Sequence, residues 1–270
     1  MASNSSDPGL LDDDAERPRE FVQSLARGLS VIRSFGDNRP ELTVTEIAGT
    51  TGLTRAAARR FLITLSELGY VETDGRMYRL TPRVLDLGYA YLSGLSFPEA
   101  ALPHLEHLVA EVEESSEASI LDLPDIVYVA RVPSPTTITI TVNVGARMPT
   151  HATAMGHVLL ADLEPDAFDR YLSTARLEGF LPNTITEPKT LRREVARVRE
   201  QGYAIVDQEL EEGLIAIAVP VRPRDERAVG TINLSTHVAR RDVRSLEREL
   251  LGPLQRTAAA IEADLASASS

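Results

Sequence analysis

The stretch LTVTEIAGTTGLTRAAARRFLITLSELGY, residues 42–70, constrains the fold of this chain more than any other part of the sequence. Thr43 and Glu46 have the Thr-x-x-Glu spacing of a capping box, which predicts a short helix that begins at this point. Gly52 permits a sharp turn, and Thr54 is placed to cap the helix that follows. The pattern therefore predicts two helices joined by a tight turn.

The residues on both sides extend this prediction. Apolar spacing predicts an upstream helix over about 22–35 with Gly36 as a left-handed stop, and the downstream helix is expected to end at Gly69. The upstream helix is expected to bury Val22, Leu25, Leu29, Ile32 and Phe35. The downstream helix is expected to bury Ala58, Phe61 or Leu62, Leu65 and Leu68. Two strands around Asp74-Gly75 would then complete a winged helix-turn-helix domain over residues 20–81.

Charge is distributed unevenly over the 270 residues, whose formal net charge is -12. Residues 19–80 contain nine basic and seven acidic residues, whereas the segments before and after them are both negative. A locally positive segment in an acidic protein suits a polyanionic partner such as DNA. We therefore expect binding to double-stranded DNA, with contacts from Thr43, Thr54, Arg55, Ala56, Arg59, Arg60 and Arg76. The alternative for the arginines is an ordinary solvated helix face.

The segments that flank this domain have distinct signatures. Residues 1–19 mix Ser, Asp, Pro and Glu and are expected to form a disordered acidic tail. Thr81-Pro82 predicts a helix over residues 82–96, because proline is favoured at the first helical position. This linker helix would present Tyr91 and Leu95 to a second subunit.

Residues 97–266 alternate between strand and helix patterns. Two strands joined at Pro124-Asp125 are expected, followed by a third strand at 136–144 and by further strands nearer the C-terminus. Helices are expected at both ends of this region. The pattern predicts an α+β, sensor-like domain with a mainly antiparallel sheet.

The composition argues against several classes of function. The chain has no cysteine, which removes thiolate catalysis, disulfides and cysteine-ligated zinc. It also lacks a G-x-S-x-G elbow and a phosphate loop, so we expect neither an enzyme nor a cofactor. No apolar run reaches the length of a membrane span, and the polar N-terminus lacks a secretory signal, so a cytoplasmic location is expected.

The histidines and one acidic run allow both a functional and an ordinary interpretation. His104 and His107 lie three residues apart and could share a metal, but no further ligands have suitable spacing. We expect these two, and also His151 and His157, to be ordinary surface or capping residues. The acidic run formed by Glu111, Glu113, Glu114 and Glu117 is expected to be a solvated helix end.

Several longer phrases resemble IclR-type transcriptional regulators over about residues 20–266. RMPTHATAMGHVLLADL and GYAIVDQELEEGLIAIAVPV stand at the corresponding places in that family. FVQSLARGLSVIRSFG, LTRAAARRFLITLSELGY, LTPRVLDLGYAYLSGL and DIVYVARVPS are similar to the PcaR/PcaU/PobR/CatR-like branch, which controls aromatic-acid catabolism through the β-ketoadipate pathway.

The resemblance implies a winged helix-turn-helix, a linker helix and a GAF-like effector-binding domain. It further implies a dimer, or a dimer of dimers, on a palindromic operator, regulated by a small acid of the protocatechuate, 4-hydroxybenzoate, β-ketoadipate or cis,cis-muconate class. The effector pocket implied by the family is lined by Ala154, Met155, Gly156, Asp207, Leu214, Ala216, Asn233 and Ser235. Ile215-Ala216 stands where several relatives have a polar or thiol residue, which suggests a more apolar pocket for a larger carbon skeleton or ring.

Alternatives remain for individual residues and for the function. Asp207 could face solvent at a strand end, Asn233 and Ser235 could fill a polar core, and Arg131 could form a surface or interface ion pair. The backbone amides at residues 154–156 are the expected donors for a ligand carboxylate. The competing functions are a regulator of other small-acid or sugar metabolism, an architectural DNA-binding protein, and an enzyme or photoreceptor on the same type of domain.

Overall fold

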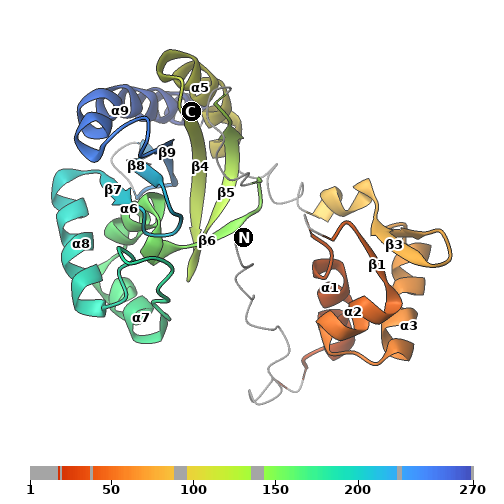
Figure 1. Ribbon diagram of the computed structural model, residues 1–270. Helices are drawn as coiled ribbons and strands as arrows, with labels where there is room; N and C mark the ends of the chain where they lie inside the picture. Colours follow the sequence, from red (N-terminus) through yellow and green to blue (C-terminus); the bar gives the residue numbers. More distant parts are fainter. Residues whose placement is uncertain are drawn as a thin grey trace. The chain divides into compact units, whose positions relative to one another are not determined.

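The computed structural model describes residues 18, 20–36, 39–87, 96–134, 143–223 and 227–268. The chain divides into two compact units, Met1–Tyr91 and Leu92–Ser270 (Figure 1). Each unit has its own hydrophobic core and is described by itself.

The N-terminal unit is the expected winged helix-turn-helix. Its elements are α1 (Gln23–Arg33), β1 (Glu41–Thr43), α2 (Val44–Thr51), α3 (Arg55–Glu67), β2 (Val71–Thr73) and β3 (Met77–Leu80). The strands form an antiparallel sheet in the order β1-β3-β2. β1 was not expected from the sequence. At the base of the hairpin, Arg79 of β3 contacts Glu72 of β2 at 2.6 Å and Glu41 of β1 at 3.1 Å, so one guanidinium joins all three strands.

Local signals around the turn act as the sequence predicted. The backbone N–H of Thr43 donates to Glu46 Oε2 at 2.8 Å, and the N–H of Glu46 donates to Thr43 Oγ1 at 3.3 Å, which completes the capping box. Gly52 takes a left-handed φ of 68° after α2. Thr54 Oγ1 then accepts from the N–H of Ala57 at 3.2 Å and caps α3.

The buried face of α1 differs from the prediction. Ile32 and Phe35 pack against the core as expected. Val22, Leu25 and Leu29 are instead 59%, 63% and 44% exposed, whereas Val31 is fully buried. The physical reason lies at Gly28, where a Cβ would stand 3.8 Å from the Phe61 ring of α3, so the glycine side is the one that packs closely.

Two further details of this unit correct the prediction. Gly36 does not adopt a left-handed φ, and α1 is capped by Ser34 in a right-handed conformation. Leu68 is 51% exposed because α3 has already ended at Glu67.

Thr81 caps a 3-10 turn, η1 (Pro82–Val84), as its sequence suggested. Residues 85–87 continue as helix, whereas residues 88–95 of the expected linker helix, which include Tyr91 and Leu95, lie outside the described residues.

The C-terminal unit is an α+β domain built on one sheet. Its strands are β4 (Ser115–Asp122), β5 (Asp125–Val132), β6 (Arg147–Pro149), β7 (Ala204–Asp207), β8 (Leu214–Val221) and β9 (Gly230–His237). Its helices are α5 (Ser96–Val112), η2 (Thr150–Ala152), α6 (Ala154–Asp162), α7 (Pro165–Thr174), α8 (Pro188–Gln201) and α9 (Val243–Ala268). The strand order is β6-β5-β4-β9-β8-β7, and all neighbours are antiparallel. Most of the strand expected at 136–144 lies outside the described residues, and β6 is the strand that pairs with β5.

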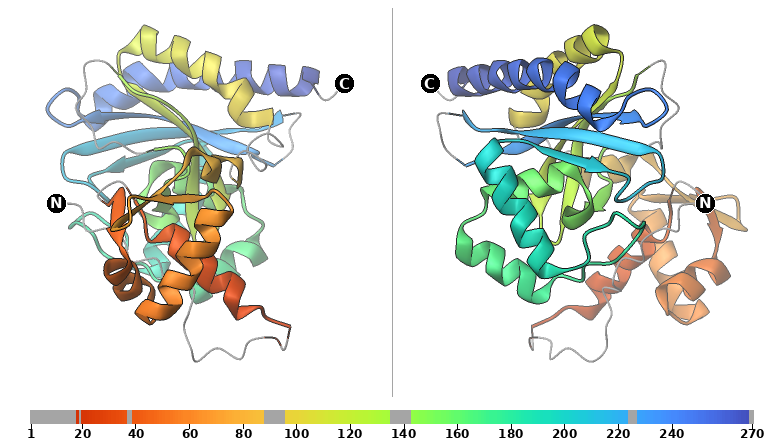
Figure 2. Two further views of the ribbon diagram at one scale, coloured as in Figure 1. Left: turned by 90° about the vertical axis from the view of Figure 1, so that its right-hand side faces the viewer. Right: turned by 60° about the vertical axis from the view of Figure 1, so that its left-hand side comes forward.

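Helices cover both faces of this sheet (Figure 2). α5 and α9 pack on one face, and α6, α7 and α8 lie on the other. Along β8, Ile215 and Ile217 belong to the α5–α9 core, while Ala216 and Ala218 belong to the α6–α8 core. This alternation is what the two-residue period of a strand requires, and the small alanines leave room for α6.

Candidate nucleic-acid interface and effector site

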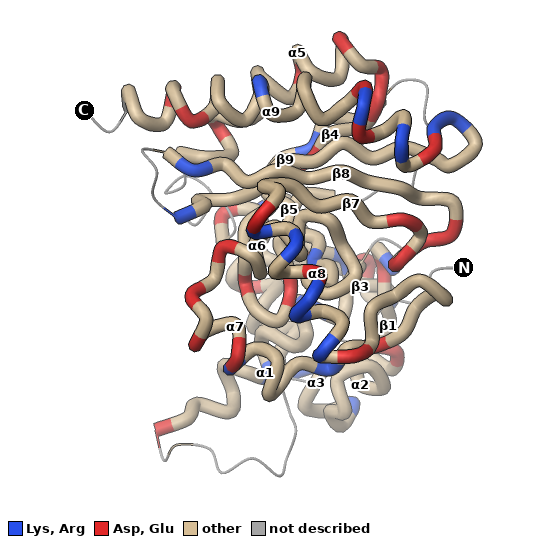
Figure 3. Tube along the Cα trace, turned by 90° about the vertical axis from the view of Figure 1, so that its left-hand side faces the viewer, with Lys and Arg blue, Asp and Glu red and all other residues tan. Residues whose placement is uncertain are grey.

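The outer face of α3 carries three unneutralised cations. Arg55, Arg59 and Arg60 are exposed, while Ala58, Leu62 and Leu65 of the same helix are buried. Within the described part of the chain, no carboxylate pairs with any of these three arginines. Arginines elsewhere are often paired, for example Arg147 with Asp122 and Arg197 with Glu194. Figure 3 marks the charged positions along the trace. The structure therefore leaves α3 with positive charge available to a partner.

The other residues expected at the interface lie around this helix. Ala56 is exposed beside the arginines, where its small side chain leaves the backbone accessible. Thr54 and Thr43 are both helix caps, and the Thr43 hydroxyl also contacts Glu46 Oε2 at 2.6 Å. The hydroxyls of Thr54 and Thr43 therefore already make capping hydrogen bonds at the N-termini of α3 and α2.

The tip of the wing presents the remaining arginine. Asp74 Oδ1 accepts from the backbone N–H groups of Arg76 and Met77, both at 2.8 Å, and these hydrogen bonds lower the pKa of the Asp74 carboxyl. Gly75 takes a φ of 97°, which completes the tight turn. The Arg76 side chain stays exposed beyond this turn.

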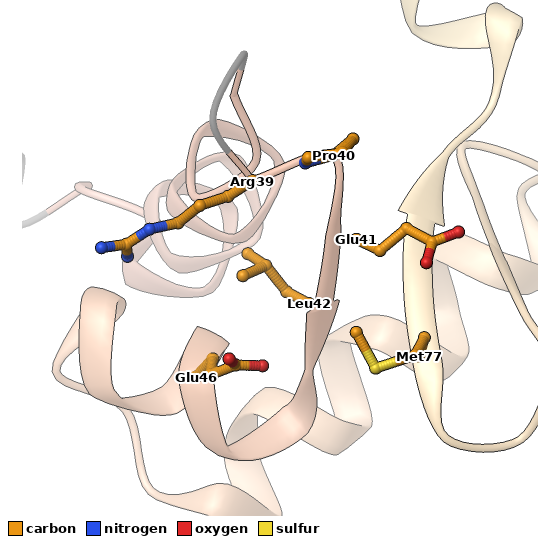
Figure 4. Close-up of a pocket in the computed structure, with 6 residues that line it drawn as sticks. All are labelled: Arg39, Pro40, Glu41, Leu42, Glu46 and Met77. Carbon is orange, nitrogen blue, oxygen red and sulfur yellow. The ribbon is translucent and has the colours of Figure 1, made fainter.

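A surface hollow also lies on this unit, beside the start of α2 (Figure 4). It is lined by Arg39, Pro40, Glu41, Leu42, Glu46 and Met77. Its two carboxylates are already engaged, Glu41 with Arg79 and Glu46 with the capping box. We therefore assign this hollow no ligand.

In the second unit, residues 154–156 form the buried first turn of α6. Thr153 Oγ1 accepts from the N–H of Gly156 at 3.1 Å, so that amide is already satisfied. A Cβ on Gly156 would stand 2.2 Å from the carbonyl oxygen of Thr150, so only glycine fits where η2 and α6 touch. Ala154 and Met155 are 2% and 1% exposed and belong to the core below α6.

Strand register brings four of the remaining expected effector residues onto one face. Asn233 pairs with Ala218, and Ser235 pairs with Ala216, so both side chains share the α6 side of the sheet. The same alternation puts Leu214 on that side. Asp207 is not among them, because its register partner is Ile215 and its strand neighbour Ile205 packs in the α5–α9 core.

A buried carboxylate, Glu117, is the site residue that the sequence did not single out. Glu117 lies in β4 opposite Asn233 and Arg131, and it is only 6% exposed. Glu114 is also fully buried and contacts Arg241 at 3.0 Å. Because α5 ends at Val112, the expectation of a solvated helix end is wrong for Glu114 and Glu117. Ser115, Glu117 and Ser119 alternate with other residues at the spacing of a strand, and this pattern could have indicated that Glu117 lies in a strand.

The surroundings of Glu117 set its protonation. Burial raises the pKa of the Glu117 carboxyl, and hydrogen bonding to Asn233, the charge of Arg131 and the Ser235 hydroxyl act against that rise. The closest ion-pair contact joins Arg131 Nε and Glu117 Oε1 at 3.7 Å, which is too long for a hydrogen bond. The Arg131 side chain is 17% exposed, so it lies at the edge of this buried cluster.

A bulge in β5 determines which β5 side chains lie on the α6 side of the sheet. The register against β4 shifts between Ala118 and Ser119, so that Ala118 pairs with Ala130 and Ser119 pairs with Tyr128. Val129 is the extra residue, and both it and Ala130 belong to the α5–α9 core. Tyr128 belongs to the core on the α6 side, where Arg131 also lies opposite Glu117. Burial raises the pKa of the Tyr128 hydroxyl.

His151 and His157 are 3% and 0% exposed, so the expectation of surface histidines is wrong for these two, and they make structural contacts instead. His157 Nε2 lies 2.8 Å from the carbonyl oxygen of His151, and His151 Nε2 lies 2.9 Å from that of Glu178. Burial lowers the pKa of both rings, which favours their neutral forms. His104 contacts Asp264 of α9 at 2.8 Å. Among the residues that the structure describes, no three His, Asp or Glu side chains form a group that could hold a metal ion.

The same described residues contain no helix with the length and apolar character needed to pass through a bilayer.

Comparison with known proteins covers both units. The profile described as "Bacterial transcriptional regulator IclR C-terminal" matches residues 89–263, and "IclR helix-turn-helix domain" matches residues 24–75. The Pca regulon regulatory protein of Pseudomonas putida is 40% identical over 235 residues, which are 86% of this chain and 80% of that protein.

Two solved structures extend the comparison to three dimensions. A crystal structure from Rhodococcus sp. RHA1 is 48% identical with a TM-score of 0.82, and the match covers 92% of this chain and all of that chain. An IclR homologue from Microbacterium hydrocarbonoxydans, complexed with 4-hydroxybenzoate, is 26% identical with a TM-score of 0.77 over 90% of this chain and 99% of that chain. Because the two profiles match both units and the Pca regulon relative at 40% identity is covered over 80% of its length, the chain belongs to the IclR family of bacterial transcriptional regulators.

Proposed function

We propose that this protein regulates genes of aromatic-acid catabolism by binding an operator through α3 and an aromatic acid through its C-terminal unit. The observation that carries the DNA-binding half is the exposed face of α3, where Arg55, Arg59 and Arg60 lack carboxylate partners among the described residues. Exposed cations are well solvated, so this face does not destabilise the isolated protein. Its arginines are available to contact phosphates and base edges of DNA.

The two classes of DNA contact have different consequences. An arginine that makes a bidentate contact to guanine contributes about 1–3 kcal/mol of discrimination between bases. A phosphate contact adds affinity that falls steeply with salt concentration. We assign the base-reading role to Arg55 and Arg59 near the start of α3, and a backbone role to Arg60 and to Arg76 on the wing.

The effector half of the proposal is supported by the relatives and by the buried face below α6. One relative is a Pca regulon regulatory protein, and a homologue of similar fold is complexed with 4-hydroxybenzoate. We place the carboxylate of the effector at the start of α6, where the N–H groups of Ala154 and Met155 point out of the first turn. Asn233 and Ser235 supply polar groups on the sheet below, while Ala216 contributes an apolar surface.

Self-association is the third part of the proposal. Phe21 and Val22, which precede α1, and Leu25 and Leu29 of α1 form an exposed apolar stripe, and these side chains are between 42% and 63% exposed. Exposed apolar side chains that cluster in this way are typical of an interaction surface. We propose that two copies associate through the N-terminal unit, act in the cytoplasm, and bind the two halves of a palindromic operator.

The test is a mobility-shift and footprinting experiment on the promoter region beside the gene. The purified protein is titrated without ligand and with protocatechuate, 4-hydroxybenzoate, β-ketoadipate or cis,cis-muconate. A protected palindrome whose occupancy changes with one of these acids supports the proposal. Binding that no acid changes would favour an architectural protein, and chemical conversion of an acid would favour an enzyme.

A further inference from the structure

One hydroxyl group joins the end of α3 to the start of the chain that leads out of the N-terminal unit. Thr81 Oγ1 donates to the carbonyl oxygen of Gly69 at 2.5 Å and accepts from the backbone N–H of Arg83 at 3.3 Å. Gly69 follows α3 by two residues, and Arg83 lies within η1. The Thr81 side chain therefore caps η1 and at the same time holds the carboxyl end of α3.

The carboxyl end of α3 is itself closed by backbone hydrogen bonds. The N–H of Gly69 donates to the carbonyl oxygen of Ser66 at 3.0 Å, and the N–H of Tyr70 donates to that of Leu65 at 2.9 Å. Gly69 takes a left-handed φ of 79°, which is common where a helix ends in this way. Gly69 and Tyr70 are thus fixed to α3, so a group that is attached to them moves with the helix.

Arg83 makes a second attachment to the same end of α3. Its guanidinium carbon lies 5.7 Å from the centre of the Tyr70 ring, which is within the range of a cation–π contact. A Cβ on Gly69 would stand 3.2 Å from Arg83 Nη1, so the arginine side chain passes close to the glycine. A cation in this position also interacts favourably with the carboxyl end of the helix dipole.

The two attachments determine how movement of the later chain reaches α3. Residues 85–87 continue as helix directly after η1, and the whole C-terminal unit follows them in the sequence. Because Thr81 and Arg83 hold η1 on the end of α3, a displacement of residues 82–87 carries α3 with it. A loose joint at the same place would absorb that displacement and leave α3 where it was.

We propose that Thr81 and Arg83 are positioning residues for regulated DNA binding. They make α3 and residues 82–87 one rigid body, so that an effector bound in the C-terminal unit moves α3 together with the rest of the N-terminal unit. The regulatory part of this inference rests on the proposed function, because it needs an effector and an operator. The attachment itself needs neither, and it can be tested on the protein alone.

The attachment is tested by double electron–electron resonance on the full chain, which has no cysteine of its own to compete for spin labels. Labels at Ala56→Cys on α3 and at Asp86→Cys, both exposed positions, report the distance across the attachment. Thr81→Val loses both hydrogen bonds of the hydroxyl, so its distance distribution should be at least about twofold broader than that of the parent chain. Thr81→Ser keeps the hydroxyl and should restore the narrow distribution.

A second variant and a control pair of labels accompany this measurement. Arg83→Ala removes the contact with Tyr70 at an exposed position, so it should fold normally and broaden the same distribution to a smaller extent. Labels at Ser24→Cys on α1 and Ala56→Cys on α3 should give one distribution in every variant, because both positions precede the attachment. An unchanged distance distribution across the attachment in both variants would overturn the proposal.

The regulatory consequence is measured by mobility shifts with and without protocatechuate or 4-hydroxybenzoate. The change in operator affinity that the acid causes should be at least about threefold smaller in Thr81→Val than in the wild-type protein. Calorimetry without DNA should give the same affinity for the acid in both proteins, which a general loss of structure would not leave unchanged. Thr81→Ser should respond to the acid as the wild-type protein does.

The outcomes separate this inference from the proposed function. A Thr81→Val variant that keeps the full wild-type response to the acid would overturn the regulatory role of the attachment. If neither acid changes the operator affinity of the wild-type protein, the proposed class of effector fails, whereas the label distances still decide whether α3 and residues 82–87 form one rigid body.

Discussion

Gly156 and Thr150 are in backbone contact: a Cβ on Gly156 would lie 2.2 Å from the carbonyl oxygen of Thr150. η2 and α6 can meet only because this residue has no side chain. The contact fixes the start of α6, from which Ala154 and Met155 present their amides.

Gly156→Ala should therefore destabilise the C-terminal unit. Separating two packed backbones to fit a methyl group costs about 1–3 kcal/mol or more. Urea unfolding followed by circular dichroism measures this loss. Gly252→Ala is the matched control, since a Cβ there stands 3.7 Å from the Arg256 guanidinium, and glycine to alanine within a helix should stabilise by about 0.5–1 kcal/mol. A Gly156→Ala variant as stable as wild type would contradict the contact.

Removing the α3 arginines should abolish operator footprinting without unfolding the protein. Arg55→Ala and Arg59→Ala each delete an exposed side chain, so the free energy of unfolding should change by less than about 0.5 kcal/mol. Mobility shifts at several salt concentrations measure the change in affinity, and a lost phosphate contact lowers the salt slope by about one.

Arg192→Ala provides the charge-matched control for these variants. Arg192 lies on α8 of the other unit and pairs with Asp169 at 2.6 Å. It removes the same charge from the protein and should leave operator affinity unchanged. Wild-type affinity in both α3 variants would remove these arginines from the reading interface.

Glu209 should make the stability of the protein depend on pH. Burial raises the pKa of Glu209 to about 8, the nearby Glu194 and Asp207 act in the same direction, and its Oε2 has no partner in the described part of the chain. The folded state holds this proton while the unfolded chain releases it above the ordinary pKa of about 4.3. The contribution to stability is therefore complete at low pH and is lost as the pH rises toward 8.

Urea unfolding at pH values from about 5 to about 8 checks this dependence, whose slope reaches at most about 1.4 kcal/mol per pH unit. Glu209→Gln should remove this part of the slope, because an amide does not titrate. Glu200→Gln, on the exposed face of α8, should keep the wild-type slope. Identical slopes in all three proteins would show that Glu209 is ionised in the folded state.

The exposed stripe on α1 should be required for self-association. Replacing Leu25 and Leu29 with glutamine removes apolar surface that the unit does not use in its own core, so folding should be retained. Sedimentation velocity should show a smaller species at the same concentration. Leu68→Gln, at a 51% exposed position just beyond α3, is the control and should sediment as wild type. An unchanged species for the α1 double variant would place the contact surface elsewhere.

The parts of the fold that were predictable from the sequence are those specified by neighbouring residues. The capping box at Thr43, the left-handed turn at Gly52 and the hairpin at Gly75 each depend on a few consecutive positions. The buried side of α1 was not predictable in this way, because it is decided by the approach of Phe61 to Gly28 from a different helix.

The candidate effector site shows the same division. Asn233 and Ser235 lie two residues apart on β9, and strand alternation places them on one face as their spacing indicates. Asp207 lies on the other face, because its side is set by pairing with Ile215 rather than by its own sequence context. Glu117 looked like one more member of an acidic run, and only the boundary between α5 and β4 reveals that it is buried.

The three-strand clamp made by Arg79 has a consequence for how regulation can work. Because β1 immediately precedes α2, pairs with β3 and is joined to it by the Arg79–Glu41 contact, the wing is attached directly to the strand that leads into the helices. Arg76 on the wing and the arginines of α3 are thus held at a fixed separation within the N-terminal unit. In the assembly that we propose, the effector therefore acts by changing the separation of two N-terminal units rather than by bending either one.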